Sequence, residues 1–157
     1  MPCAALPSDE PTITRFERGH ADGFRTLVAD TLREFGFEPD PQIDPDLADP
    51  EAVYTALWVA MLDGAVVGSI ALRDLGGNKL ELKRMYLRAS QRGHGLGKRL
   101  LATALDWARA NGATVIRLDT SERMETAQRL YEAYGFQRVP GDAPRQGQQR
   151  LLYELRL

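Results

Sequence analysis

The stretch that decides the fold of this chain is Arg92-Gly93-His94-Gly95-Leu96-Gly97-Lys98, in which glycines occupy alternate positions. The residues before it, Leu80–Leu87, have the character of a strand. After it, apolar residues recur at helical spacing from Leu96 to Ala108. A glycine-rich turn between a strand and a helix start leaves backbone N–H groups unpaired, and such a place binds anions, most often phosphates. The first prediction is therefore a phosphate-binding turn.

Working outward on the N-terminal side, residues 1–11 carry three prolines, and we predict a disordered leader there. Residues 12–157 are expected to form a single domain. Apolar residues at helical spacing predict a helix from about 22 to 35. Residues 57–62 and 66–72 read as strands joined at Asp63-Gly64, a strong hairpin signal. With 80–87 they predict a three-stranded antiparallel meander.

On the C-terminal side, residues 115–119 read as a strand that lies parallel to 80–87 through a right-handed crossover. A helix follows that carries Ala127, Leu130, Tyr131 and Tyr134 on one face. Residues 136–139 and 151–157 would complete the sheet, with a polar, mobile loop over 141–149 between them. The predicted fold class is α/β, with a mixed central sheet of six to seven strands flanked by about four helices.

Composition narrows the functional classes. The net charge of −2 and the mixed charges give no support for a nucleic-acid partner, and the apolar runs are too short to span a membrane. The N-terminus lacks the features of a signal peptide. The one cysteine, Cys3, can form no internal disulfide. With two histidines it does not supply the four ligands of a structural zinc site, so we expect no metal. A cytoplasmic location is the expectation.

Two familiar phosphate-binding motifs do not fit the glycine-rich stretch. A P-loop requires glycine where Arg92 stands, and a Ser or Thr where Arg99 follows Lys98. A dinucleotide fingerprint requires G-x-G-x-x-G after a βαβ-type strand, whereas the glycines here are spaced G-x-G-x-G after an antiparallel meander. Both nucleotide-binding interpretations are rejected.

The remaining pattern, Arg92-x-x-Gly95-x-Gly97, resembles the acetyl-CoA-binding motif of the GNAT acyltransferase superfamily. The decapeptide Ala127–Phe136 resembles that superfamily's second marker, A-x-x-L-Y-x-x-x-G-F. The close resemblance runs over Trp58–Phe136. It implies a GNAT fold, in which the parallel pair of strands splays apart at the CoA site, and an acetyl-CoA-dependent N-acetyltransferase.

The resemblance also implies which residues bind the donor. The backbone of the strand end pairs with pantetheine, and one of its N–H groups polarises the thioester carbonyl. The glycines allow close approach of the pyrophosphate, and the helix N-terminus and the cations attract it. The expected donor-binding residues are Met85, Tyr86, Leu87, Arg92, Gly93, His94, Gly95, Leu96, Gly97 and Lys98. An asparagine that many members place before the second marker is replaced by Met124.

Two side chains are the candidate catalytic groups. Tyr131 matches a tyrosine that family members often place near the CoA sulfur, where a phenol of pKa ~10 can protonate a departing thiolate of pKa ~8.5. The alternative is a buried helix tyrosine. Glu81 matches a general-base glutamate of several members, and the alternative is a charge paired with Lys83 or Arg84.

The expected reaction is direct acetyl transfer to a primary amine of a small molecule, in a ternary complex with no acyl-enzyme. A protein lysine or N-terminal acetyltransferase and a non-catalytic CoA-binding module remain as alternatives. The acidic, proline-rich stretch Glu38–Glu51 lies where the acceptor pocket is expected, and its carboxylates either receive a cationic amine or belong to a simple solvated loop. The choice between a monomer and a homodimer is left open.

Overall fold

The computed structural model describes residues 10–141 and 145–157. The leader predicted over residues 1–11 therefore falls mostly outside the described residues. Its last residue, Pro11, is buried, and its carbonyl accepts a hydrogen bond of 3.0 Å from Arg99. Pro11 is thus part of the folded domain. Among the residues described, no helix combines the length and apolar character that a membrane crossing requires.

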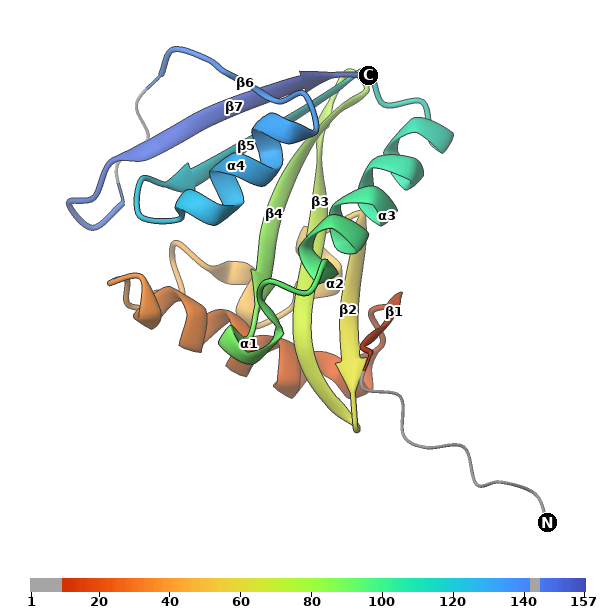
Figure 1. Cartoon of the computed structure of the whole chain (residues 1–157), viewed down its shortest axis with the longest axis vertical. Coiled ribbons are helices and arrows are strands. Elements are labelled where there is room, and N and C mark those ends of the chain that lie inside the picture. The colour runs from red at the N-terminus through yellow and green to blue at the C-terminus, as the bar shows by residue number, and fades with distance from the viewer. Residues whose placement is uncertain (1–9, 142–144) are drawn as a thin grey trace.

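A mixed sheet forms the centre of the molecule (Figure 1). Over the described ranges it has seven strands in the order β1-β2-β3-β4-β5-β7-β6. Their bounds are β1 Thr12–Arg15, β2 Ala56–Leu62, β3 Ala65–Gly76, β4 Lys79–Leu87, β5 Val115–Ser121, β6 Gln137–Arg138 and β7 Arg150–Arg156. Among these described strands, β4 and β5 are the pair that runs parallel, and the other neighbours are antiparallel. The predicted meander and the parallel crossover are confirmed.

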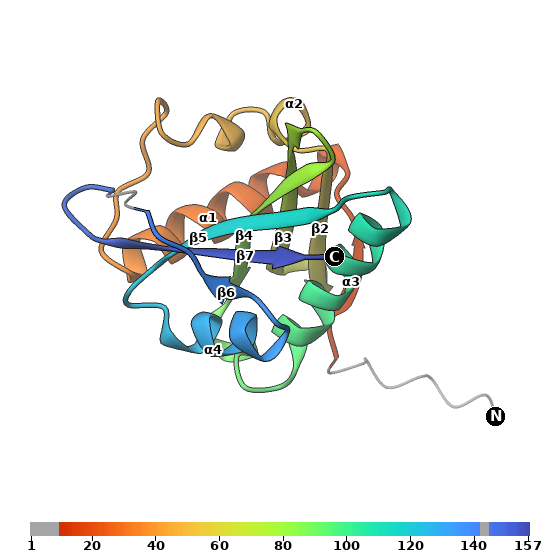
Figure 2. The ribbon, with the colours of Figure 1, turned by 90° about the horizontal axis from the view of Figure 1, so that it is seen from above.

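Helices cover both faces of this sheet. The α-helices of the described part are α1 Ala21–Glu34, α2 Pro50–Val53, α3 Leu96–Ala110 and α4 Glu125–Ala133. Figure 2 shows α1 and α2 on one side of the sheet and α3 and α4 on the other. On the α1 side, Phe24, Val28 and Leu32 are buried against the sheet with Phe37. This layering gives the α/β architecture expected from the sequence.

The connection between β2 and β3 shows why the meander could be predicted. Asp63 and Gly64 have φ values of +49° and +78°, the left-handed pair that a two-residue hairpin turn requires. Short polar residues and glycine adopt this conformation at low cost. The dipeptide therefore determines the turn locally, without help from the rest of the fold.

The parallel pair separates along its length. Lys79–Glu81 of β4 pair with Val115–Arg117 of β5, and the rest of β5 pairs only with β7. In Figure 1 the two strands lie together near the C-terminus and diverge away from it. The remainder of β4 therefore has one edge on β3 and the other edge on an open gap. This is the splayed pair that the family resemblance implied.

A β-bulge begins just beyond the point of separation. Ser69 pairs with Tyr86 and Ala71 pairs with Lys83, so β4 contains one residue more than β3 in this interval. Arg84 lies in the bulge with φ of +55°, and its carbonyl accepts a 2.7 Å hydrogen bond from the Ser69 hydroxyl. An arginine in the left-handed region is strained, so tertiary contacts must hold it there.

Those contacts are a buried network of ion pairs. The guanidinium of Arg84 donates to Asp46 at 2.8 Å and to Asp44 at 2.7 Å. Asp46 also accepts from the Tyr54 hydroxyl at 2.6 Å, and Asp44 accepts two hydrogen bonds from Arg145. Asp44 and Asp46 are each 2% exposed. The network ties the bulge to the segment before α2 and to the hairpin before β7.

Burial alone would raise the pKa values of Asp44 and Asp46. Hydrogen bonds from Arg145 and Arg84 to Asp44, and from Arg84 to Asp46, outweigh this effect and hold both pKa values below their usual range. Since the folded pKa values are depressed, their contribution to stability is present above the unfolded pKa of about 3.9 and is lost as the pH falls below it.

We predict that Asp46→Asn lowers the free energy of unfolding by about 3 kcal/mol, because it leaves part of the Arg84 charge buried without its partner. Urea denaturation at neutral pH measures the change. Asp22→Asn is the matched control, since Asp22 pairs with Arg25 on the surface and its side chain is 97% exposed. The difference between wild type and Asp46→Asn should shrink below pH 4. Equal effects of the two substitutions at neutral pH would contradict the prediction.

Candidate active site

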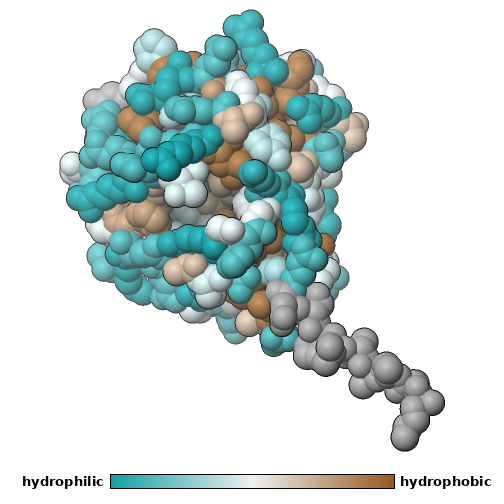
Figure 3. Space-filling model, viewed as in Figure 1, coloured by the Kyte–Doolittle hydropathy of each residue, from teal (hydrophilic) through white to brown (hydrophobic). Residues whose placement is uncertain are grey.

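The larger cavity lies where the glycine-rich turn, the end of β4 and α4 meet. Its volume is about 580 Å³. It is lined by Thr31, Phe35, Met85, Tyr86, Leu87, Arg92, Gly93, Gly95, Gly97, Lys98, Arg123, Met124, Glu125, Thr126, Ala127, Arg129, Leu130 and Ala133. Figure 3 shows a recess on this face of the molecule, with hydrophilic side chains along its rim. We call it the donor cavity.

The glycine-rich turn supplies the donor cavity with backbone N–H groups that have no partner within the helix. Gly95 precedes the first turn of α3 with φ of +85°, and no side chain caps this helix end. The N–H groups of Leu96, Gly97 and Lys98 therefore have no acceptor within the helix. An added Cβ at Gly97 would approach Leu130 of α4 to 3.3 Å, so the glycine also permits close packing of the two helices. This geometry suits an anion such as a pyrophosphate.

Cations surround these free donors. Lys98 lines the cavity and forms no ion pair with the described residues. Arg123 and Arg129, which the sequence analysis did not single out, also line it, and Arg129 lies 3.9 Å from Glu125. Arg123 precedes the second marker and Arg129 occupies one of its variable positions. The motif therefore does not identify either arginine. The excess of positive charge favours a multiply anionic ligand.

Arg92 has a structural partner that the sequence analysis did not anticipate. Its guanidinium makes a bidentate ion pair with Glu34 at the end of α1 and donates to the Leu87 carbonyl at 2.9 Å. Hydrogen bonds from Arg92 lower the pKa of Glu34. Its charge still faces the cavity, but these contacts make it an anchor that joins the turn, β4 and α1.

The free edge of β4 faces the gap between the strands. The Arg88 N–H donates to the Val67 carbonyl of β3 at 2.9 Å. Because alternate residues of a strand direct their backbone groups to opposite edges, the N–H and C=O of Leu87 point away from β3. The Leu87 carbonyl is the acceptor of Arg92, and its N–H is the available donor at this edge.

The remaining predicted donor-binding residues fall into two groups. Met85, Tyr86, Leu87, Gly93 and Lys98 line the donor cavity with Arg92, Gly95 and Gly97. By contrast, the side chain of Leu96 is 2% exposed and packs in the core, and His94 is exposed outside the cavity lining. Their assignment as donor-binding residues stays a prediction, which for Leu96 concerns the backbone.

A second cavity, of about 330 Å³, lies on the other side of the gap. It is lined by Leu32, Ile43, Leu82, Lys83, Arg84, Met85, Tyr86, Asp119, Thr120, Met124, Tyr131, Arg145, Gln146 and Arg150. We call it the acceptor-side cavity. Met85, Tyr86 and Met124 line both cavities, so the two meet at the splayed strands.

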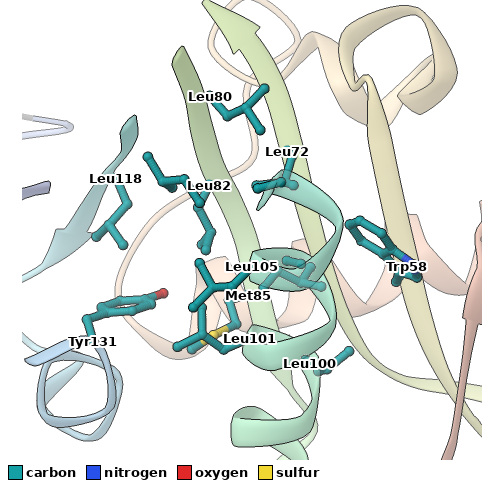
Figure 4. Close-up of a cluster of buried hydrophobic side chains, with 14 of the residues drawn as sticks. Trp58, Leu72, Leu80, Leu82, Met85, Leu100, Leu101, Leu105, Leu118 and Tyr131 are labelled. Atoms are coloured by element: carbon teal, nitrogen blue, oxygen red, sulfur yellow. The ribbon is translucent and has the colours of Figure 1, made fainter. Parts of the chain in front are cut away.

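Tyr131 lines the acceptor-side cavity together with Met85. Its side chain leaves α4 with the hydroxyl directed toward β4, between Leu118 and Met85 (Figure 4). The residue is 4% exposed, and within the described ranges its hydroxyl has no hydrogen-bond partner. Burial, with a smaller contribution from Tyr86, raises the pKa of Tyr131. The phenol is therefore protonated at neutral pH and free to donate.

Glu81 lies elsewhere. It belongs to the part of β4 that still pairs with β5, and its carboxylate is 3.0 Å from Arg73 and 3.8 Å from Lys83. It is absent from the lining of both described cavities. The role of Glu81 as general base stays a prediction, and it would require water to connect the carboxylate with an amine.

The acceptor side contains residues that sequence reasoning missed. Arg145 lies in the segment 141–149 that was expected to be a mobile loop, of which residues 142–144 fall outside the described residues, and Arg150 is the first residue of β7. Each of the two side chains is only 12% exposed. Asp119 is the carboxylate on the wall of this cavity, and Arg150 donates to it at 2.9 Å. The pairing of Asp44 and Asp46 with arginines also removes the free carboxylates proposed for a cationic amine. For Asp44 and Asp46, the expectation of an amine-binding carboxylate and the alternative of a solvated loop were therefore both wrong.

This combination of fold and site defines a class: a splayed β4–β5 pair beside an uncapped, glycine-rich helix start is the arrangement of an acyl-CoA-dependent transferase. The family model described as the Acetyltransferase (GNAT) family matches residues 22–136. The chain therefore belongs to the GNAT acetyltransferase family, as the sequence resemblance indicated. It is an acetyl-CoA-dependent N-acetyltransferase by family.

Relatives support this assignment. An uncharacterized N-acetyltransferase of Schizosaccharomyces pombe is 34% identical over 122 residues, which cover 73% of this chain and 75% of that protein. The N-acetylaspartate synthetase of Danio rerio is 36% identical over 106 residues, which cover 64% of this chain and 38% of that protein. The chain thus matches well under half the length of the second relative.

Solved structures share the fold. A GNAT-family acetyltransferase of Staphylococcus aureus superposes with a TM-score of 0.83 at 24% identity, covering 93% of this chain and 98% of that one. The acetyltransferase YncA of Salmonella typhimurium, solved with acetyl-CoA, superposes with a TM-score of 0.74 at 20% identity, covering 94% of each chain. The mixed sheet and its flanking helices are therefore those of the family.

We predict that Gly95→Ala weakens acetyl-CoA binding about fivefold or more, because an L side chain at φ of +85° strains the turn by about 1–2 kcal/mol. Gly112→Ala is the matched control, since Gly112 follows the other end of α3 with φ of +78° and open space around its Cβ position. Both variants should lose similar thermal stability. Isothermal titration with acetyl-CoA should separate them, and equal affinities would refute the assignment of the turn.

Proposed function

We propose that the protein transfers the acetyl group of acetyl-CoA to a primary amine of a small molecule, directly and within a ternary complex. The observation that carries the proposal is the meeting of the donor and acceptor-side cavities at Met85, Tyr86 and Met124. A thioester entering along β4 would reach this opening from one side and an amine from the other. Direct attack needs only that the two be held together.

In the donor cavity, the free N–H groups at the start of α3 would bind the pyrophosphate and the outer edge of β4 would pair with pantetheine. The Leu87 N–H would donate to the thioester carbonyl and stabilise the charge that develops on its oxygen. Met124 replaces an asparagine side-chain anchor and forms an apolar contact surface at the opening of both cavities.

The chemistry balances without an acyl-enzyme. The neutral amine nitrogen attacks the thioester carbon, the C–S bond breaks, and the nitrogen loses a proton while the sulfur gains one, giving an amide and CoA thiol. Tyr131 would donate a hydrogen bond to the leaving thiolate. Because burial raises the pKa of this phenol, Tyr131 would keep its proton and would stabilise the thiolate through the hydrogen bond.

The size of the acceptor-side cavity favours a small acceptor over a protein. About 330 Å³ is at the lower end of small-molecule sites. Segments around Ile43 and Arg145 form its walls, whereas a peptide would need a groove open at both ends. The name of one relative, N-acetylaspartate synthetase, also describes a small N-acetylated product.

We expect Tyr131→Phe to lower kcat at least about tenfold and to leave the Kd of acetyl-CoA nearly unchanged, because only the hydrogen-bond donor to the leaving thiolate is removed. Tyr153→Phe is the control, since the ring of Tyr153 neighbours Tyr131 but its hydroxyl donates to Glu132 at 2.9 Å. Free-thiol release measures turnover. Unchanged turnover of Tyr131→Phe would remove Tyr131 from the mechanism, and no turnover by wild type with any amine would favour a non-catalytic module.

The base assignment of Glu81 gives a separate prediction. If Glu81 accepts the amine proton through water, Glu81→Gln lowers kcat/KM at neutral pH about tenfold or more. The difference in kcat/KM between wild type and variant should become smaller as the pH rises, because more of the amine is then neutral. Arg73→Gln is the matched control, because it breaks the same ion pair and leaves the carboxylate in place. Similar losses in both variants would show that the ion pair matters and that Glu81 is not the base.

A further inference from the structure

We propose that the acceptor-side cavity recognises an amine that also carries a carboxylate, as amino acids do, and that Arg150 binds the carboxylate. This inference rests on the proposed function, because it names the acceptor class for the same site. It replaces the cationic amine that the acidic stretch suggested.

The charged groups on the cavity wall are mostly positive. Among the described lining residues, Lys83, Arg84, Arg145 and Arg150 stand against the single carboxylate of Asp119. The carboxylates that balance Arg84 and Arg145 are not part of the wall, because Asp44 and Asp46 are buried behind the arginines. A ligand in the cavity therefore lies closer to these cationic groups than to Asp44 and Asp46, which favours an anionic group.

Arg150 has the geometry of a prepared carboxylate site. Its Nε donates to the Asp119 carboxylate at 2.9 Å, and one Nη donates to the Asp119 carbonyl at 3.2 Å. The other Nη has no hydrogen-bond partner within the described residues. The guanidinium is thus held in one orientation with donor capacity left over, and carboxylates are preferred partners of such a planar donor group.

Arg145 reinforces this part of the wall. Its two Nη atoms are taken by Asp44, and its Nε is buried without a partner among the residues described. The guanidiniums of Arg145 and Arg150 lie 5.4 and 5.6 Å from the ring centre of Phe37, which is 1% exposed. Contact with one buried ring keeps both cations fixed beside the cavity.

The position of this pair relative to Tyr131 determines which end of the acceptor is modified. Tyr131, Met85 and the opening to the donor cavity lie on the same cavity as Arg150. A molecule with its carboxylate at Arg150 can extend its amine toward that opening. A second positive charge in place of the carboxylate would meet Arg145 and Arg150 and would bind poorly.

The test is a set of matched acceptors assayed with acetyl-CoA: L-amino acids, the carboxamides of the same amino acids, and the amines that remain when the carboxylate is removed. We expect at least one amino acid to have a kcat/KM about tenfold or more above its amide and its amine. Transfer to amides or simple amines with no preference for any carboxylate would overturn this inference and leave the proposed function standing. Absence of transfer to every acceptor would overturn both.

Variants then assign the preference to Arg150. Arg150→Gln should raise the KM for the preferred amino acid about tenfold or more, leave the KM for its amide and for acetyl-CoA unchanged, and be partly rescued by Arg150→Lys, which keeps the charge. Arg156→Gln is the control on the same strand, since the Arg156 side chain is 87% exposed. A loss that is equal for the acid and the amide would show a structural role for Arg150 and would refute the assignment.

Discussion

The separation of β4 from β5 is the constraint on which the rest of the structure depends. The two strands share three paired positions and then part, so the outer edge of β4 is free where the two cavities meet. A bulge at Arg84 begins this free stretch, and a left-handed arginine there is held by buried carboxylates from a distant segment. The strand edge that a donor would use is thus maintained by residues on the acceptor side.

The sequence predicted most of the fold because the signals were local. Apolar runs bounded by turn signals identified the central strands, helical spacing identified α1, α3 and α4, and the Asp63-Gly64 turn determined the meander. The splay itself came from the family resemblance, since no local pattern shows where a parallel ladder ends. The bulge was not predicted, because Arg84 is an ordinary strand residue in sequence and its conformation depends on partners about forty residues away.

The donor side of the site could be predicted because its signals are also local in the sequence. The acceptor side could not be predicted in this way. Gly95 and Gly97 act through backbone conformation and close packing, which leave a recognisable pattern in the sequence. Arg145 lies in a polar segment that resembles a solvated loop and Arg150 begins β7, and their burial depends on Asp44 and Phe37, about a hundred residues earlier in the chain. Charge in the sequence therefore indicated the wrong sign for the wall of the acceptor-side cavity, because Asp44 and Asp46 are neutralised by tertiary pairing.

The pairing of Asp44 with Arg145 has a consequence for how such a protein can diversify. Two connecting segments joined by this ion pair contribute Ile43, Arg145 and Gln146 to the wall of the acceptor-side cavity, whereas the donor cavity is built mainly from the glycine-rich turn, β4 and α4. Replacing one member alone would leave an uncompensated charge in the interior, which is costly. Evolution toward a new acceptor would thus proceed by joint replacement of the two segments, so homologues should change both positions together while the glycine-rich turn stays the same.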